Sequence, residues 1–353
     1  MARAGEYPLI TVAMVALNRE WIIGHALKSL LSQTYPHDRI FFVLVDGGSV
    51  DRTVEVVREA LSGSDLAGFE VVVQRSNIPE ARNIAIERMR GEAIFFWDSD
   101  VLLEPDGLKM LYEAASDYGI DILSADTLSI KVSSVEEGWR VLEELCKKRG
   151  KIGVELVPAV AMGATLIRKI VLDRVRFDPE LTFGEDADFC VKARSLGYRV
   201  AVHRGVVAVD VNVTGRAGSD IYVSKPLTEL LKGIRKKAKV KVLGLSFDPG
   251  LKDVLVYMWR YKRYLYYLGY LPMLVALIVG LAKNLPMLTL LFPAYVLPYL
   301  LYQAKRRGIL LGLKTFIASL VVGLPLSLSM LAYATARSLE RFVSTPRRKK
   351  HVR

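Results

Sequence analysis

Residues 93–100, AIFFWDSD, carry an apolar run directly into two carboxylates, Asp98 and Asp100. A short apolar run bounded by polar residues is typical of a buried strand in a parallel sheet. Open α/β sheets bind ligands beyond the carboxyl ends of their strands, where this acidic pair is then expected to lie. Paired carboxylates supply the hard oxygen ligands that suit Mg²⁺ or Mn²⁺. An Asp-x-Asp pair is a weak motif by itself, and taken alone it is better explained as a solvated strand end.

The segments around this stretch alternate between strand and helix patterns. Short apolar runs predict strands at residues 9–16, 40–45, 69–74, 92–97, 120–125 and 198–202, with two more around a bend within 154–167. Apolar residues at helical spacing predict helices at residues 20–33, 53–61, 79–89, 105–116 and 135–148, and one that ends at Leu196. This alternation forms right-handed βαβ units, so the sequence predicts an α/β fold built on a parallel sheet.

Composition narrows the class of partner. The chain has 353 residues, enough for about two domains, and a formal net charge of +12. Its densest basic run, residues 347–350, follows an apolar segment, so a membrane lipid surface explains the charge better than nucleic acid. Residues 1–8 do not resemble a signal peptide, so the first globular part is expected to stay in the cytosol. Cys146 and Cys190 match no disulfide framework or metal motif and are expected to be buried thiols.

Five short motifs occur in a fixed order: VAMVALN at 12–18, VDGGSVDRT at 45–53, ARN at 81–83, DSD at 98–100 and GEDAD at 184–188. Together they resemble the family 2 glycosyltransferases over residues 8–209. The resemblance implies a GT-A fold, which is Rossmann-like with a mostly parallel sheet and flanking helices. It also implies a nucleotide-diphospho-sugar donor, a divalent cation and inversion at the anomeric carbon. Val45 departs from the family pattern, which commonly has an aspartate there.

The resemblance places the donor and the metal at the strand ends. A metal held by carboxylates would neutralise the charge that grows on the leaving diphosphate. Asp100 is the first metal candidate, followed by Asp98 and, after the next strand, His203. The predicted donor-binding residues are Asn18, Asp46, Arg82 and Asp98. Considered singly, Arg82 is equally compatible with a helix-surface arginine, and a lone histidine is more often structural.

The acceptor side of such a reaction needs a base, because a sugar hydroxyl is a poor nucleophile until its proton is removed. Asp186 stands at the start of a predicted helix, where outward-pointing N–H groups favour a negative charge. Spacing alone would make it an N-cap residue. The resemblance favours Asp186 as the general base, with Glu185 and Asp188 in supporting roles.

The last third of the chain predicts membrane helices. Residues 264–281, 285–302 and 315–336 are apolar runs near the length needed to span a bilayer, although a buried core helix is the alternative for each. The basic residues 228–242 read as a helix lying on lipid, and the aromatic residues within 249–267 favour the headgroup level. With three crossings, the basic runs 305–307 and 347–350 would lie on opposite sides of the membrane. The positive-inside rule instead places both runs on the cytosolic side.

The predicted domains are therefore a catalytic domain at 1–215, a basic juxtamembrane region at 216–263, about three transmembrane helices at 264–336 and a basic tail at 337–353. The interpretation is an inverting glycosyltransferase of the cell membrane, with Mg²⁺ or Mn²⁺ and a hydroxyl acceptor, either a lipid-linked saccharide or a glycan, at the cytosolic face. One alternative is a polyprenyl-phosphate glycosyltransferase similar to dolichol-phosphate mannose synthase, whose acceptor needs no base. Another is a transporter or membrane scaffold with an inactive GT-A domain.

Overall fold

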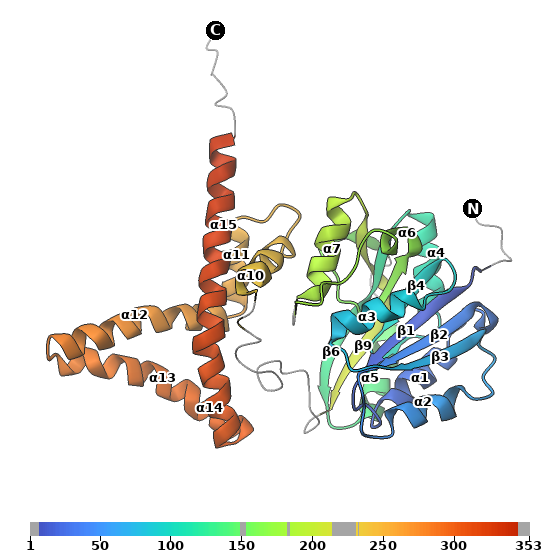
Figure 1. Ribbon diagram of the computed structural model, residues 1–353, viewed down its shortest axis with the longest axis horizontal. Coiled ribbons are helices and arrows are strands. Elements are labelled where there is room, and N and C mark those ends of the chain that lie inside the picture. The colour runs from blue at the N-terminus through green and yellow to red at the C-terminus, as the bar shows by residue number, and fades with distance from the viewer. Residues whose placement is uncertain (1–6, 149–152, 182–183, 214–230, 232, 345–353) are drawn as a thin grey trace, which may run out of the picture. The chain divides into compact units, whose positions relative to one another are not determined.

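The computed structural model describes residues 7–148, 153–181, 184–213, 231 and 233–344 (Figure 1). The chain divides into two compact units, Met1–Gly218 and Ser219–Arg353. The first unit is an α/β domain and the second is helical. Two predicted features fall partly outside the described residues: the basic tail from position 345 onward, and the start of the juxtamembrane region at 216–230.

A parallel half-sheet opens the first unit, with β3, β2, β1 and β4 side by side in that order. These strands are β1 (Ile10–Ala16), β2 (Ile40–Asp46), β3 (Gly68–Val73) and β4 (Ala93–Trp97). All three pairings between them run parallel. The connections contain α1 (Ile23–Leu31), the short turn η1 (His37–Arg39), α2 (Thr53–Leu61) and α3 (Ile78–Glu87). The predicted alternation of strand and helix is confirmed here, and with it the α/β class.

Antiparallel pairing enters where β8 (Ala164–Arg168) joins β4. The sheet continues with β6 (Ile122–Val132), β9 (Val200–Val213) and β5 (Val101–Leu103), and β7 (Val154–Leu156) also pairs with β9. The remaining helices are α4 (Gly107–Asp117), α5 (Val135–Lys147), α6 (Lys169–Leu172) and α7 (Glu185–Ser195). β6 and β9 are longer than predicted because both continue beyond a bulge. The sequence analysis missed β5, whose three residues are too few to show a period.

Helices cover both faces of the sheet, which explains the continuous apolar runs in its strands. In β4, Phe95 and Trp97 join the core on the α1 side, while Ile94 and Phe96 join the core on the α3 side. Every residue of β4 is buried. The first charged side chain after this buried strand is Asp98, which follows β4 directly.

The second unit contains α10 (Ile234–Leu243), α11 (Leu251–Arg260), α12 (Arg263–Ala282), α13 (Pro286–Arg307), α14 (Ile309–Ala318), the π-helical turn η2 (Ser319–Gly323) and α15 (Leu324–Ser344). Among the described residues, three helical segments are long and apolar enough to cross a membrane: Arg263–Ala282, Pro286–Lys305 and Ile309–Glu340. They contain the predicted runs 264–281 and 315–336 and all but the first residue of the run 285–302. The third segment is not one regular helix, because η2 interrupts it.

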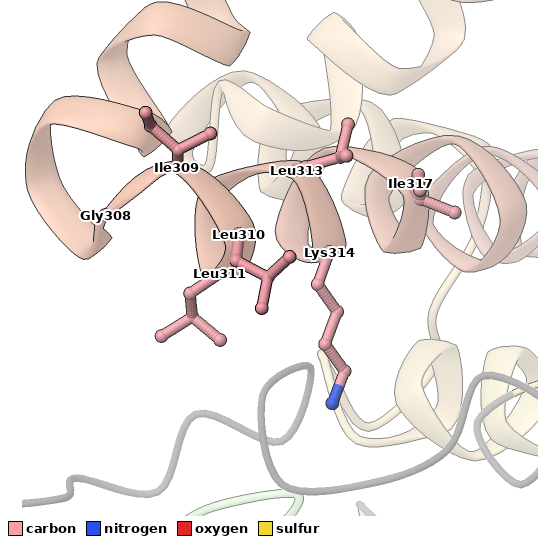
Figure 2. Close-up of a pocket in the computed structure, with 7 residues that line it drawn as sticks. All are labelled: Gly308, Ile309, Leu310, Leu311, Leu313, Lys314 and Ile317. Carbon is pink, nitrogen blue, oxygen red and sulfur yellow. The ribbon is translucent and has the colours of Figure 1, made fainter.

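A shallow groove runs along α14 and is lined by Leu310, Leu313, Ile317 and the stem of Lys314 (Figure 2). Leu310 is 86% exposed, although it is a large apolar residue. An apolar surface of this kind on a candidate span suits lipid chains better than water. The groove belongs to the helical unit and contains none of the residues predicted to bind donor or acceptor.

Candidate active site

The acidic pair lies where the sequence placed it, immediately after β4, and two backbone hydrogen bonds hold it there. The N–H of Asp98 donates to the carbonyl of Gly163 at 2.9 Å, and the N–H of Val211 donates to the carbonyl of Asp100, also at 2.9 Å. The first bond ties the pair to the residue before β8, and the second ties it to β9. Three strands therefore meet around the two carboxylates.

Gly163 leaves the space that the Asp98 carboxylate occupies. A Cβ added at Gly163 would lie 2.8 Å from Oδ2 of Asp98, closer than real Cβ contacts allow. The side chain of Asp98 would have to swing away, because the backbone on both sides is held in the sheet.

Gly163→Ala is expected to displace the Asp98 carboxylate while leaving the fold intact. We expect metal-dependent affinity for the donor nucleotide to fall about tenfold, the equivalent of ~1.4 kcal/mol. Calorimetric titration of nucleoside diphosphate in the presence of Mn²⁺ measures this change. Gly153→Ala is the matched control, since a Cβ there meets nothing within 4 Å. Equal affinity in the two variants would show that the position of Asp98 does not matter for donor binding.

The two aspartates repel one another in a partly buried setting, with side chains that are 42% (Asp98) and 25% (Asp100) exposed. Burial, reinforced by the charge of Asp98, raises the pKa of Asp100 to about 7, although Arg19 acts against this shift. Burial also raises the pKa of Asp98, against the influence of Arg82. The nearest guanidinium nitrogen of Arg19 lies 3.9 Å from Oδ2 of Asp100. Arg82 also faces Asp186 and Glu185, and Arg19 also faces Asp210, so the carboxylates here outnumber the two arginines. A divalent cation would relieve this excess of negative charge.

The sequence analysis did not identify Asp210, a third carboxylate at this place. It lies on β9 opposite Val101 of β5, directly beyond the acidic pair. Its negative charge contributes to the raised pKa of both Asp98 and Asp100. Burial raises the pKa of Asp210 as well, and Asn212 donates a hydrogen bond to its Oδ1 at 3.2 Å. Asp98, Asp100 and Asp210 together offer hard oxygen donors that fit Mg²⁺ or Mn²⁺.

No group of three or more histidine, cysteine, aspartate or glutamate side chains in the described part of the chain is arranged closely enough to coordinate one metal ion. The fit to a cation therefore rests on oxygen chemistry and charge excess, and ligation would require the carboxylates to move toward the ion.

Arg82 occupies a different position from the one expected for a donor-binding residue. Its side chain on α3 is only 5% exposed, and one of its terminal nitrogens bonds to Oδ1 of Asp186. The other terminal nitrogen lies 3.7 Å from Oδ1 of Asp98. Burial opposes the charge of Arg82, but Asp186, Asp98 and Glu185 outweigh that effect and raise its pKa. Arg82 thus lies beneath the site and links the acidic pair to the motif on α7.

Asp186 begins its helix as the sequence analysis expected. Gly184 precedes α7 with φ of 80°, a left-handed conformation that glycine adopts without strain. Oδ2 of Asp186 accepts the N–H of Met162 at 3.1 Å, while its Oδ1 faces Arg82. Each carboxylate oxygen has two lone pairs, so both retain capacity for a further partner.

The neighbours of Asp186 complete this motif. Burial, with the charge of Asp186, raises the pKa of Glu185 to about 7, against the influence of Arg82. Asp188 pairs with Lys192 at 2.6 Å one turn further along α7. Asp188 therefore stabilises the helix and does not point its charge at the acidic pair.

Asp46 is fully buried and is bonded within its own loop, so its contact with the donor stays a prediction. Its Oδ1 accepts the N–H groups of Gly48 and Ser49 at 2.9 and 2.7 Å, and its Oδ2 accepts the hydroxyl of Ser49. Asn18 has φ of 53° and accepts the N–H of Val50 at 3.0 Å. Asp46 shapes the loop after β2, while the exposed Asn18 ties that loop to the end of β1 and remains accessible to a ligand.

His203 is not brought to the acidic pair. It is registered with Ala125 of β6, whereas Asp210 is registered with Ser129, four positions further along. At ~3.3 Å per strand residue, the positions of His203 and Asp210 are therefore roughly 13 Å apart along the strand direction. Nδ1 of His203 accepts the N–H of Gly205 at 3.1 Å, within the bulge of β9. The predicted metal-binding role of His203 therefore does not fit this position, and Asp210 is the carboxylate that lies beside the acidic pair.

Comparison with known proteins agrees with the motifs. Residues 11–176 match the model of the family described as Glycosyl transferase family 2. The poly(ribitol-phosphate) beta-N-acetylglucosaminyltransferase TarS of Staphylococcus aureus is 28% identical over 200 residues, covering 54% of this chain and 33% of its own length. The putative glycosyltransferase EpsH of Bacillus subtilis is 33% identical over 113 residues, 32% of each chain. The chain thus spans about a third of the length of these relatives.

A solved structure of S. aureus TarS residues 1–349 in complex with UDP-GlcNAc aligns with a TM-score of 0.48 at 18% identity. The alignment covers 88% of this chain and 90% of that one.

Proposed function

We propose that this chain, whose residues 11–176 form a family 2 glycosyltransferase domain, is a membrane-anchored inverting glycosyltransferase. It would transfer a sugar from a nucleotide-diphospho-sugar to a hydroxyl of a lipid-linked saccharide or glycan. The proposed catalytic domain is residues 1–215, on the cytosolic face of the cell membrane. The observation that carries the proposal is the pair of acidic groups on either side of Arg82, one after β4 and one at the start of α7.

The first group serves the donor. Asp100 and Asp98, with Asp210 beside them, would hold Mg²⁺ or Mn²⁺ together with the diphosphate. The bound ion would neutralise the charge that develops on the leaving nucleoside diphosphate. Arg19 pairs with Asp100 at 3.9 Å and is a further cation next to the diphosphate position.

The second group serves the acceptor. The acceptor oxygen attacks the anomeric carbon from the face opposite the diphosphate, the bond from that carbon to the diphosphate oxygen breaks, and the hydroxyl proton passes to a carboxylate oxygen of Asp186. A single displacement of this kind inverts the anomeric configuration. Arg82 and the N–H of Met162 fix the plane of the Asp186 carboxylate, so the base is held in place before the acceptor arrives.

A hydroxyl acceptor is favoured over a polyprenyl phosphate, because a phosphate is already anionic and gains little from a fixed base. The positioning of Asp186 by two separate contacts supports a role in proton removal. The staphylococcal relative is named for poly(ribitol-phosphate), a polymer acceptor. Both acidic groups are present in this chain, which argues against an inactive domain on a transporter or scaffold.

A donor screen tests the proposal. The full chain in detergent is incubated with a panel of UDP-, GDP- and dTDP-sugars in Mg²⁺ or Mn²⁺, and nucleoside diphosphate release is measured. We expect release from one donor class and its loss when EDTA is added. If no donor is bound and no nucleoside diphosphate is released with either ion, the assignment is contradicted.

The raised pKa of Asp100 predicts a pH-dependent metal affinity. Without metal, the folded carboxyl keeps its proton up to about pH 7, whereas the unfolded one loses it near its ordinary pKa of 3.8. The contribution of this group to stability therefore falls as pH rises through that window. A cation must displace the proton, so we expect the Kd for Mn²⁺ to increase about tenfold for each pH unit below 7. Calorimetric titration between roughly pH 5.5 and 8 measures this, and a constant Kd would contradict it.

A further inference from the structure

We infer that only α12 and α13 cross the bilayer, and that α10, α11 and α15 form a layer along the membrane surface on the side where α12 begins. This inference rests on the membrane attachment in the proposed function and does not depend on the transfer reaction. Two crossings would keep the basic runs 305–307 and 347–350 on one side, as the positive-inside rule requires. Residues 347–350 lie outside the described part of the chain, whereas the helices before them are described up to residue 344.

The geometry of α12 and α13 suits a transmembrane hairpin. α12 has 20 residues, a rise of about 30 Å, and Arg263 and Lys283 mark its two ends. The hydroxyl of Tyr266 donates to the carbonyl of Tyr295 at 2.9 Å, and the hydroxyl of Tyr295 donates to the carbonyl of Tyr266 at 2.8 Å. Only 17% and 11% of the two apolar windows are buried within the protein, so lipid is available to cover the rest.

The third apolar segment, Ile309–Glu340, packs more of its hydrophobic side chains against protein than α12 and α13 do. A larger share of its window, 39%, is buried within the protein. Leu326, Met330 and Ala334 recur at four-residue spacing on one face of α15 and are buried. α15 packs against α10, α11 and α12, and it runs across α12 and α13 rather than beside them along its length (Figure 1). Packing against protein therefore accounts for part of the hydropathy of this segment.

The charges of α10 and α11 limit how deep α15 can lie. These two helices carry exposed cations: Arg235, Lys236, Lys239, Lys252 and Arg260. α11 is fixed to α15 where the N–H of Leu251 donates to Oγ of Ser338 at 3.0 Å, and Arg337 pairs with Asp248 at 3.1 Å. If α15 crossed the bilayer, it would draw these cations into the hydrocarbon, where a charge is costly.

Aromatic side chains indicate the level of this layer. The ammonium of Lys241 on α10 lies 5.2 Å from the ring centre of Tyr257 and 5.8 Å from that of Tyr264. Tyr264 belongs to the first turn of α12, so α10 and α11 meet the hairpin at its entrance. Trp259 on α11 is 72% exposed, and tryptophan favours the lipid headgroup region. The partner that fits this surface is an anionic bilayer surface.

Depth measurement on α15 tests the inference. Leu328 and Leu339 are 39% and 60% exposed and lie 11 residues apart, on the same face and about 16 Å apart along the axis. Nitroxide labels at Leu328→Cys and Leu339→Cys are compared by collision with oxygen and with a nickel chelate, in vesicles containing anionic lipid. The full chain with Cys146→Ser and Cys190→Ala is the background. Leu274→Cys and Leu281→Cys on α12, 37% and 66% exposed, are the matched control pair.

We expect labels at 328 and 339 to report the same shallow depth, and labels at 274 and 281 to differ by about 10 Å. A depth difference between positions 328 and 339 as large as that of the control pair would overturn the inference. Two labels that both lie deep in the hydrocarbon would also overturn it. An independent check uses an impermeant maleimide on Asn284→Cys and Val352→Cys in intact cells and inverted vesicles. The two sites should react from opposite sides, and reaction from the same side would show a third crossing.

Discussion

Asp186→Asn is expected to slow sugar transfer by ~10²–10⁴-fold while leaving donor affinity within about twofold of the unchanged protein. The amide cannot accept the acceptor proton, so the step that forms the new bond loses its base. Asparagine keeps the size of the side chain and still caps a helix well. The bond to Arg82 weakens because one charge is lost, but Met162 still has an oxygen to donate to.

Transfer rate and donor affinity must be measured side by side on the same preparation. Asp173→Asn is the matched control, since it makes the same chemical change at an exposed residue that pairs with Lys169 on α6. Near-normal turnover of Asp186→Asn with intact donor binding would remove the base assignment and favour a polyprenyl phosphate acceptor. A loss of donor affinity equal to the loss of rate would instead move Asp186 to the donor side.

Asp100→Asn is expected to abolish measurable transfer, with a loss of at least ~10³-fold, because a charged ligand of the metal becomes a neutral amide. Unlike the change at Asp186, it should also weaken nucleoside diphosphate binding in Mn²⁺. The variant also loses the carboxyl whose burial raises its pKa to about 7, so the metal-free protein should be slightly more stable above neutral pH.

EDTA provides the internal control for Asp100→Asn. Without a divalent ion, the variant and the unchanged protein should bind nucleoside diphosphate with similar affinity. With Mn²⁺ added, only the unchanged protein should gain affinity. An equal gain in both would show that Asp100 does not ligate the metal, and attention would pass to Asp98 and Asp210.

Local patterns identified the residues whose placement follows from their own segment. Asp98 and Asp100 follow a strand that is buried on both faces, and Asp186 follows a glycine at a helix start, so each position could be predicted from its neighbours in sequence. The same holds for the α/β class, because apolar strands and amphipathic helices alternate over the first part of the chain.

Residues that depend on pairing between distant segments could not be predicted in the same way. Asp210 reaches the site because β5, only three residues long, pairs antiparallel with β9. Gly163 touches Asp98 because β8 runs antiparallel to β4. The burial of Arg82 depends on contacts with α7, about a hundred residues later in the chain. Nothing in the local sequence distinguishes such residues from ordinary surface positions.

Asp46 and His203 illustrate the opposite case. Asp46 was predicted from family resemblance and His203 from its place after a strand, and in both cases the structure shows a local hydrogen-bond partner for the side chain. Asp46 shapes its own loop, and His203 accepts a backbone N–H within the bulge of β9. A motif residue next to a ligand site therefore need not face the ligand.

The anomeric configuration of the product tests the account most directly. The full chain is supplied with its α-linked nucleotide sugar, Mn²⁺ and a hydroxyl acceptor, and the new linkage is read by proton NMR before any rearrangement. One base at Asp186 opposite a diphosphate held at Asp98 and Asp100 predicts a single displacement and a β-linked product. An α-linked product, or a sugar bound covalently to the protein, would contradict the arrangement proposed here.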